Sequence, residues 1–428
     1  MQDVVVVSIF GRGNWLASEL ADNNFKVSLV DISQEFGRWA PEDWEGPFGF
    51  FQTSQLKASQ LERLSEEDYL EPIEEGFTLL LDKGPLELTG SMAQFCLDKY
   101  KIHPAGLRYV ENYSKNREID KSQLSNIRND SFENNWFVQL SHQLASHVYR
   151  SNTDSLSEGY PLPLFSPYFI RRVTRRGQDK SLDWCEKKGV QVFRNAQILD
   201  MRLSHRDIES LELKSDWSGV LESKNFVWCL SGLESQRLSG NITSSLFPKG
   251  PIVPTWSWIR YRFDLNLNEN TNVIPSKFII INDKYLSWSH ENLCVLQKTV
   301  KDGQYDIWVR IPSQQRFHRS YIDELMFKIS NIVDDKIPLS SPQIVDKPQD
   351  YLYEESELGP SRFPVYSAED LKKRKDAPYS NLFFDGPEYW PLLEWNSQFS
   401  HQEDVLKRII NWRSRQLAKQ KIESEVSP

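Results

Sequence analysis

The residues best suited to chemistry lie in a short turn near the N-terminus. The turn reads SIFGRG over residues 8–13, between an apolar run and an amphipathic stretch, and Asp31 closes the next apolar run. Glycines in such a turn let backbone N–H groups approach a phosphate at a helix N-terminus, and an acid after the next strand can hold a ribose hydroxyl. The pattern predicts a dinucleotide site in which Arg12 could neutralise the pyrophosphate.

Two alignments with the fingerprint G-x-G-x-x-G are open. In the first, Gly11 and Gly13 are the first two glycines, and Asp31 follows at roughly the 20 residues that the fingerprint expects. In the second, Gly13 is the third glycine, so Ser8 and Phe10 replace the first two. A Phe10 side chain would then project into the volume that a pyrophosphate needs. The first alignment instead makes a shifted turn that still cradles phosphate.

The elements expected to position this turn form a βαβ unit. Residues 4–7 are an unbroken run of valine, which is typical of a strand buried on both faces. Residues 14–23 have helical spacing of apolar side chains, and residues 26–30 predict a second strand that ends in Asp31. The opening of the chain therefore indicates an α/β fold.

The stretch DVVVVSIFGRGNWLASELADNNFKVSLVD (residues 3–31) resembles, without a gap, the opening of the flavin amine oxidase, protoporphyrinogen oxidase and phytoene desaturase superfamily. That superfamily has a FAD/NAD(P)-binding Rossmann fold and also contains the Rab GDP-dissociation inhibitors. The gap-free comparison favours the second alignment. Asn24 stands where relatives end the helix with glycine, and Asn tolerates the left-handed conformation.

Further blocks carry the same resemblance. Gly37 and Arg38 match the end of a Gly-Gly-Arg segment, and residues 187–232 are the closest block, in which Ile198 would face the adenine. Near the C-terminus, Gly386 matches the glycine of a Gly-Asp pair. If FAD is bound, the resemblance implies that the cofactor-binding residues are Gly11, Arg12, Gly13, Asp31, Gly37, Arg38, Ile198 and Gly386.

The cofactor signature is nevertheless eroded at three places. Ser8 and Phe10 replace glycines, the segment 162–164 (Leu-Pro-Leu) stands where a glycine-rich turn is expected, and Pro387 replaces the aspartate of Gly-Asp. Proline offers neither an acceptor side chain nor an amide donor for the cofactor. FAD is therefore a doubtful cofactor, and the sequence indicates no catalytic residue.

The resemblance implies a Rossmann-like FAD/NAD(P)-binding fold with an interleaved α+β substrate domain of mixed sheet and helices. We expect a discontinuous Rossmann domain from residues 1–90, 180–245 and 355–428, and a substrate-binding-like domain from residues 91–179 and 246–354. Alternating strands between residues 254 and 312, a following helix, and an amphipathic C-terminal helix that packs on the first domain complete this expectation.

Composition excludes several other classes. A net charge of −9 argues against a nucleic-acid-binding surface, and 39% hydrophobic residues are enough for large cores. The four cysteines lie far apart without metal-ligand spacing, the histidines form no metal motif, and no G-x-S-x-G elbow is present. Neither a signal peptide nor a membrane-spanning segment is indicated, so we expect a cytoplasmic protein without a metal.

Two hypotheses for function follow. The first is a cofactor-impaired relative of the flavin amine oxidases that acts by binding an unknown protein or small-molecule partner. The second is an active FAD-dependent oxidoreductase, for amine oxidation or C–H oxidation and desaturation, with a divergent phosphate-binding turn. In the second case FAD supplies the redox chemistry and the protein supplies orientation.

Overall fold

A computed structural model describes most elements around the predicted dinucleotide turn. The described residues are 1–9, 11–33, 57–60, 70–73, 78–81, 84–87, 148–149, 169–172, 177–238, 240–265, 277–282, 290–299, 301–337, 340–348, 364–367, 377–390 and 395–426. Phe10, Gly37, Arg38 and the segment 162–164 lie outside them, so the predictions at these residues stay predictions.

The first of two large sheets is built around the N-terminal strand. Within the described residues it has seven strands in the order β8-β2-β1-β11-β10-β9, with β18 paired to β11. Strands β8, β2, β1, β11 and β18 are parallel, whereas β9, β10 and β11 form an antiparallel meander. The strands are β1 (Gln2–Ser8), β2 (Val27–Asp31), β8 (Gln191–Phe193), β9 (Gln197–Leu203), β10 (Ile208–Lys214), β11 (Ser218–Trp228) and β18 (Leu382–Phe384).

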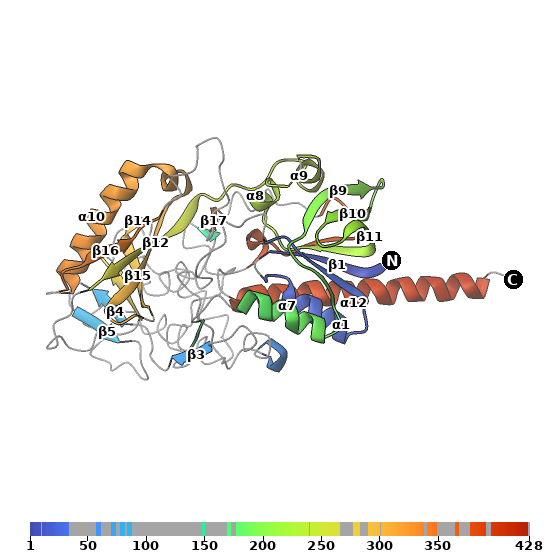
Figure 1. Cartoon of the computed structure of the whole chain (residues 1–428), viewed down its shortest axis with the longest axis horizontal. Helices are drawn as coiled ribbons and strands as arrows, with labels where there is room; N and C mark the ends of the chain where they lie inside the picture. The colour runs from blue at the N-terminus through green and yellow to red at the C-terminus, as the bar shows by residue number, and fades with distance from the viewer. Residues whose placement is uncertain are drawn as a thin grey trace, which may run out of the picture.

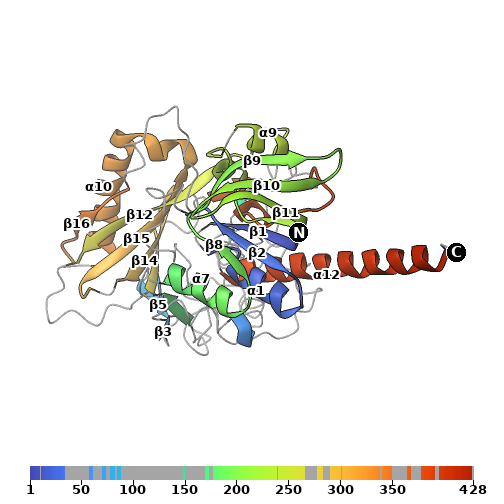
Figure 2. The same ribbon diagram turned by 45° about the vertical axis from the view of Figure 1, so that its right-hand side comes forward.

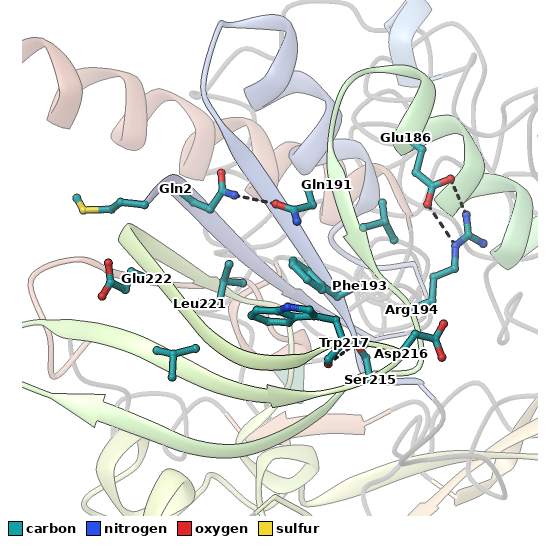
Figure 3. Close-up of a pocket in the computed structure, with 13 residues that line it drawn as sticks. Gln2, Glu186, Gln191, Phe193, Arg194, Ser215, Asp216, Trp217, Leu221 and Glu222 are labelled. Carbon is teal, nitrogen blue, oxygen red and sulfur yellow. Dashed lines mark hydrogen bonds and ion pairs between the residues drawn. The ribbon is translucent and has the colours of Figure 1, made fainter.

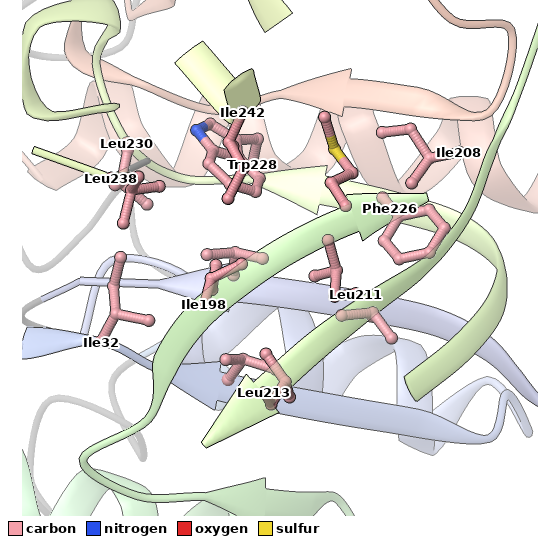
Figure 4. Packing of buried hydrophobic residues seen from close by; sticks show 14 of the residues in the cluster. Ile32, Ile198, Ile208, Leu211, Leu213, Phe226, Trp228, Leu230, Leu238 and Ile242 are labelled. Atoms are coloured by element: carbon pink, nitrogen blue, oxygen red, sulfur yellow. The ribbon is translucent and has the colours of Figure 1, made fainter. Parts of the chain in front are cut away.

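The valine run in β1 is buried on both faces of this sheet. Val4 and Val6 pack against α1 (Asn14–Asp22), α7 (Gly177–Lys187) and α12 (Trp395–Val426). Val5 and Val7 belong to the cluster on the other face, with Ile198, Leu211 and Leu213 of the meander (Figure 4). Successive side chains of a strand point to opposite faces, so a strand covered on both sides needs an unbroken apolar run.

The helices therefore cover one face of the parallel strands, and β9 and β10 of the meander cover the other face (Figures 1 and 2). Val405 and Ile409 of α12 are fully buried in the helical layer, which confirms that this amphipathic helix packs on the first sheet. Asn24, just after α1, has φ 62° and takes the left-handed conformation expected from the sequence. No described helix is long and apolar enough to cross a membrane.

The second sheet is mixed and is covered on one face by α10 (Arg319–Lys336). Its described strands follow the order β5-β4-β13-β14-β15-β12-β17-β6, with β16 paired to β12. They are β4 (Thr78–Leu81), β5 (Gly84–Glu87), β6 (Val148–Tyr149), β12 (Trp256–Asp264), β13 (Lys277–Ile281), β14 (His290–Lys298), β15 (Gln304–Pro312), β16 (Gln343–Asp346) and β17 (Pro364–Ser367).

The second sheet takes strands from residues that the sequence assigned to the first unit. Residues 78–81, 84–87 and 364–367 contribute β4, β5 and β17 to it. The domain boundaries stay a prediction. The remaining described elements are β3 (Leu70–Ile73) and β7 (Phe169–Arg172), which pair with each other, and the short helices α8 (Gly232–Ser235), α9 (Gly240–Leu246), η5 (Ser313–Phe317) and η7 (Pro387–Tyr389).

Candidate dinucleotide site

The predicted phosphate turn connects the carboxyl end of β1 to α1. The Arg12 N–H donates to Ile9 O at 3.0 Å, and Gly11 has φ 77° in the third position of this β-turn. Only glycine adopts that conformation without steric cost, so Gly11 fixes the path of the turn. The Gly13 N–H, at the start of α1, donates to Ser8 Oγ at 3.2 Å. A side chain of the protein thus accepts from an amide at the helix N-terminus.

Gly13 is required by close packing. A Cβ at this residue would lie 2.5 Å from Val6 Cγ1 and 3.0 Å from Cys229 Sγ. Val6 belongs to β1, and Cys229 directly follows β11. Close helix–strand packing is the role of the third glycine of the dinucleotide fingerprint. The position of Gly13 therefore favours the second alignment of the turn.

Arg12 is held by a carboxylate of the protein itself. Its Nη1 donates to Glu234 Oε1 at 2.8 Å and to Oε2 at 2.6 Å, and the two side chains are only 8% and 5% exposed. The guanidinium carbon lies 5.5 Å from the centre of the Trp390 ring. The cation that the sequence offered to a pyrophosphate is thus neutralised by a buried glutamate.

Glu234 is fixed in turn by a capping box at α8. The Ser231 N–H donates to Glu234 Oε2 at 2.7 Å, and the Glu234 N–H donates to Ser231 Oγ at 3.1 Å. Reciprocal bonds of this kind satisfy two backbone donors that the helix leaves open. The carboxylate that faces Arg12 therefore has little freedom to move away.

The N-terminal part of α12 covers the same turn. Gln398 Nε2 donates to Arg12 O at 2.6 Å, and Gln402 Nε2 donates to Arg12 O and to Asp385 Oδ2, the latter at 2.6 Å. Asp385 also accepts from Trp390 Nε1 at 3.0 Å. The turn, the segment after β18 and α12 are thereby joined by a buried polar network.

Two carboxyl groups of this network have altered proton affinity. Burial raises the pKa of Asp385 to about 6, although His401 and the hydrogen bonds from Gln402 and Trp390 favour its charged form. Burial also raises the pKa of Glu388 to about 7, against the hydrogen bond that the Gly232 N–H donates to its Oε1 at 2.9 Å. Desolvation disfavours the charged form of a carboxyl group and outweighs these partners.

Gly386 and Pro387 bring this segment against the end of β11. A Cβ at Gly386 would lie 2.5 Å from Leu230 O, so only glycine permits this close approach. Pro387 is the first residue of η7, where its missing N–H and fixed φ are tolerated. The pair therefore places Glu388 beside Gly232. The aspartate of the resembled family would stand one residue before Glu388, at the position of Pro387.

Of the other predicted residues that the structure describes, Asp31 lies beside the turn and Ile198 lies in the core. Asp31 of β2 lies next to Ser8 of β1, because the two residues are partners in the parallel pairing of these strands. The Asp31 carboxylate is 4% exposed and accepts from Ser33 Oγ at 2.5 Å, as in a turn cap. Ile198 is 3% exposed in the core between the first sheet and its meander. The structure thus brings together Gly11, Arg12, Gly13 and Gly386, with Asp31 beside them.

Sequence reasoning missed the acids and amides that complete this network. The Ser-x-x-Glu pattern at residues 231–234 was a readable signal for the capping box. Gln398 and Gln402 have the spacing of one helix face, but no local pattern indicates that their partner is the backbone of Arg12.

Comparisons with known proteins give a fold and no closer relationship. No protein-family model matches the sequence, and no curated protein matches it. A putrescine oxidase variant with redesigned cofactor binding matches with a TM-score of 0.56 at 12% identity, over 96% of this chain and 99% of that one. An oxidoreductase from Methanosarcina mazei matches with a TM-score of 0.55 at 12% identity, over 95% and 100% of the two chains.

The chain has the FAD/NAD(P)-binding Rossmann-type fold. A geranylgeranyl bacteriochlorophyll reductase-like protein from Thermoplasma acidophilum supports the same conclusion, with a TM-score of 0.51 at 10% identity over 99% of this chain and 83% of that one. The fold class expected from the sequence is therefore confirmed. In this fold the dinucleotide binds outside the carboxyl ends of the strands, which is where the buried network around Arg12 lies.

Proposed function

We propose that this protein uses the FAD/NAD(P)-binding Rossmann-type fold without holding FAD at the phosphate turn, and that it acts by binding a protein or small-molecule partner. The observation that carries the proposal is the buried Arg12–Glu234 ion pair. The Glu234 carboxylate already pairs with the Arg12 cation, which a pyrophosphate would otherwise bind. The protein is then a cytoplasmic relative of the flavin amine oxidases that has kept the architecture and lost the cofactor.

The neighbouring contacts support this proposal. Gln398, Gln402 and Trp390 surround the same turn, and each of them is less than 10% exposed. A dinucleotide would have to displace these side chains and leave Glu234 without its cation. Breaking a buried ion pair costs about 3–5 kcal/mol, which corresponds to at least a 100-fold loss in affinity. The residues present therefore do not fit a pyrophosphate, and we derive no redox step.

Thermal unfolding with added nucleotides tests the proposal. A ligand present at 1,000 times its Kd stabilises the folded state by about 4.1 kcal/mol. FAD at millimolar concentration would then raise the Tm by several degrees if it bound with micromolar affinity. We expect no shift with FAD, NAD or NADP. A saturable shift with FAD would overturn the proposal.

The active oxidoreductase is the second candidate, and the conformation of Gly11 favours it. A residue with φ 77° turns the backbone sharply at the predicted phosphate position, as a shifted phosphate turn requires. If FAD raises the Tm, the Arg12→Ala variant distinguishes FAD bound at the phosphate turn from FAD bound elsewhere on the protein. Loss of the shift in this variant, with the shift kept in the matched surface variant Arg194→Ala, would indicate that FAD binds at the turn and would favour the second candidate.

A further inference from the structure

A groove lies at the other end of the first sheet from the phosphate turn. It has a volume of about 670 Å³ and opens beside Gln2, at the amino end of β1 (Figure 3). Gln2 and Ser8 are six residue steps apart along the strand, which corresponds to about 20 Å. Its lining includes Gln191, Phe193, Arg194, Asp216, Trp217 and Glu222.

Trp217 forms a fixed aromatic wall of this groove. Its ring packs against Phe193 with centroids 5.4 Å apart, and a Cβ at Gly219 would lie 2.3 Å from Trp217 Cζ2. The absence of a side chain at Gly219 therefore makes room for the indole. The Trp217 N–H donates to Ser215 Oγ at 3.1 Å, and the Ser215 N–H donates to Trp217 O at 2.8 Å. The turn that carries the ring is held by its own hydrogen bonds.

The indole is nevertheless partly open to solvent. Trp217 is 44% exposed, although its ring contacts Phe193 and lies against the backbone at Gly219. An aromatic ring that is held in position but left exposed in a concave site is a surface prepared for contact with another molecule. Its rigidity lowers the entropy that a ligand must offset on binding.

The charge of the groove is negative. Glu186, Asp216 and Glu222 line it, against the Arg194 side chain and the amino group of Met1. Arg194 Nη2 lies 2.5 Å from Asp183 Oδ1 and 3.1 Å from Glu186 Oε2, so its charge is already balanced. Asp216 and Glu222 remain as the acids of the groove that can attract a cation toward the exposed part of Trp217.

We propose that this groove binds an arginine side chain of a partner protein, with the guanidinium plane on Trp217 and its N–H groups directed to Asp216 or Glu222. A guanidinium is planar, stacks on aromatic faces and pairs with carboxylates through two parallel hydrogen bonds. The volume exceeds that of one guanidinium and leaves room for flanking peptide. The groove is independent of the phosphate turn, so the proposal does not rest on the absence of FAD.

The position of β8 favours a peptide as the occupant. Among the described residues β8 is the terminal strand of the first sheet, and Gln191, Val192 and Phe193 of this strand line the groove. A terminal strand offers backbone hydrogen-bonding groups along which an extended segment can lie. The arginine would then be anchored on the wall that Trp217 forms.

Calorimetric titration of the full chain with the peptide acetyl-Gly-Arg-Gly-amide tests the proposal. The matched probe contains citrulline, which has nearly the same shape as arginine without the charge. We expect saturable binding of the arginine peptide with a Kd on the order of 1 mM, a value that corresponds to about −4.1 kcal/mol. We expect weaker binding in 0.5 M salt and about tenfold weaker binding of the citrulline peptide.

Variants assign the binding to the groove. Trp217→Leu should weaken binding of the arginine peptide about fivefold, whereas Trp217→Phe keeps an aromatic face and should stay within about twofold. Phe327→Leu, at an aromatic residue that is 65% exposed on α10, should leave binding unchanged. No saturable binding, equal binding of the two peptides, or an unchanged affinity in Trp217→Leu would overturn the proposal.

Discussion

The strongest energetic prediction concerns the buried partner of Arg12. Glu234→Gln removes the negative charge but keeps an oxygen that can accept from the Ser231 N–H, so the capping contact is preserved. The Arg12 side chain, 8% exposed, is then left as an uncompensated buried cation. Removing one partner of a buried ion pair costs about 3–5 kcal/mol, and we expect a loss near 3 kcal/mol because the acceptor oxygen remains.

Urea unfolding at pH 7, followed by circular dichroism, measures this loss as a change in midpoint at constant m-value. The matched control is Asp183→Asn, which removes a partner of Arg194 in an exposed ion pair and should cost less than about 1 kcal/mol. Adding Arg12→Met to Glu234→Gln should restore at least half of the loss, since no buried charge remains. A loss below about 1 kcal/mol in Glu234→Gln would refute the assignment of this pair as a buried, structure-forming contact.

The remaining predictions concern pH and backbone geometry. Burial raises the folded-state pKa of Asp385 from 3.8 to about 6 and of Glu388 from 4.5 to about 7. The folded protein therefore binds more protons than the unfolded chain between about pH 4 and 7. Stability should fall as pH rises through this window, by up to about 1.4 kcal/mol per pH unit for each group. Urea midpoints from pH 5 to 8 measure this slope; Glu388→Gln should flatten it, and parallel curves for wild type and variant would contradict the assignment. Gly13→Ala should destabilise by about 1–3 kcal/mol because its methyl group meets the first sheet, whereas Gly240→Ala, with no atom within 4 Å of the added Cβ, should be near neutral; thermal unfolding that ranks the two alike would be contrary evidence. Asn24→Ala should cost about 1 kcal/mol at φ 62° and Asn24→Gly should cost less, so the reverse order in the same assay would exclude a left-handed residue there.

Local patterns were sufficient to predict the elements of the first sheet. The valine run, the helix after the turn and the acid at the end of β2 lie where the sequence placed them. The left-handed residue Asn24 was also foreseen, because helix-ending residues of this kind are restricted to few amino-acid types. Such features depend on neighbours in the chain, which the sequence displays directly.

Long-range contacts escaped the same reasoning. The pairing of β4 with β13, about two hundred residues later in the chain, is one that no local pattern indicates. Arg12 was interpreted as a partner for phosphate, whereas its side chain meets Glu234 and its carbonyl meets Gln398 and Gln402. A buried cation pairs with the carboxylate that lies nearest to it in space. The packing of α8 and α12 on the sheet determines which side chains are near Arg12.

The absorbance spectrum of gently purified wild-type protein from about 300 to 550 nm, followed by a titration with FAD, tests the central claim most directly. The claim is that Glu234, Gln398, Gln402 and Trp390 close the phosphate turn around Arg12. We predict a spectrum without a flavin band and no saturable change on adding FAD. A flavin band near one equivalent, or a stoichiometric spectral shift during the titration, would contradict the claim and favour the FAD-dependent oxidoreductase, whose activity substrate screening would then test.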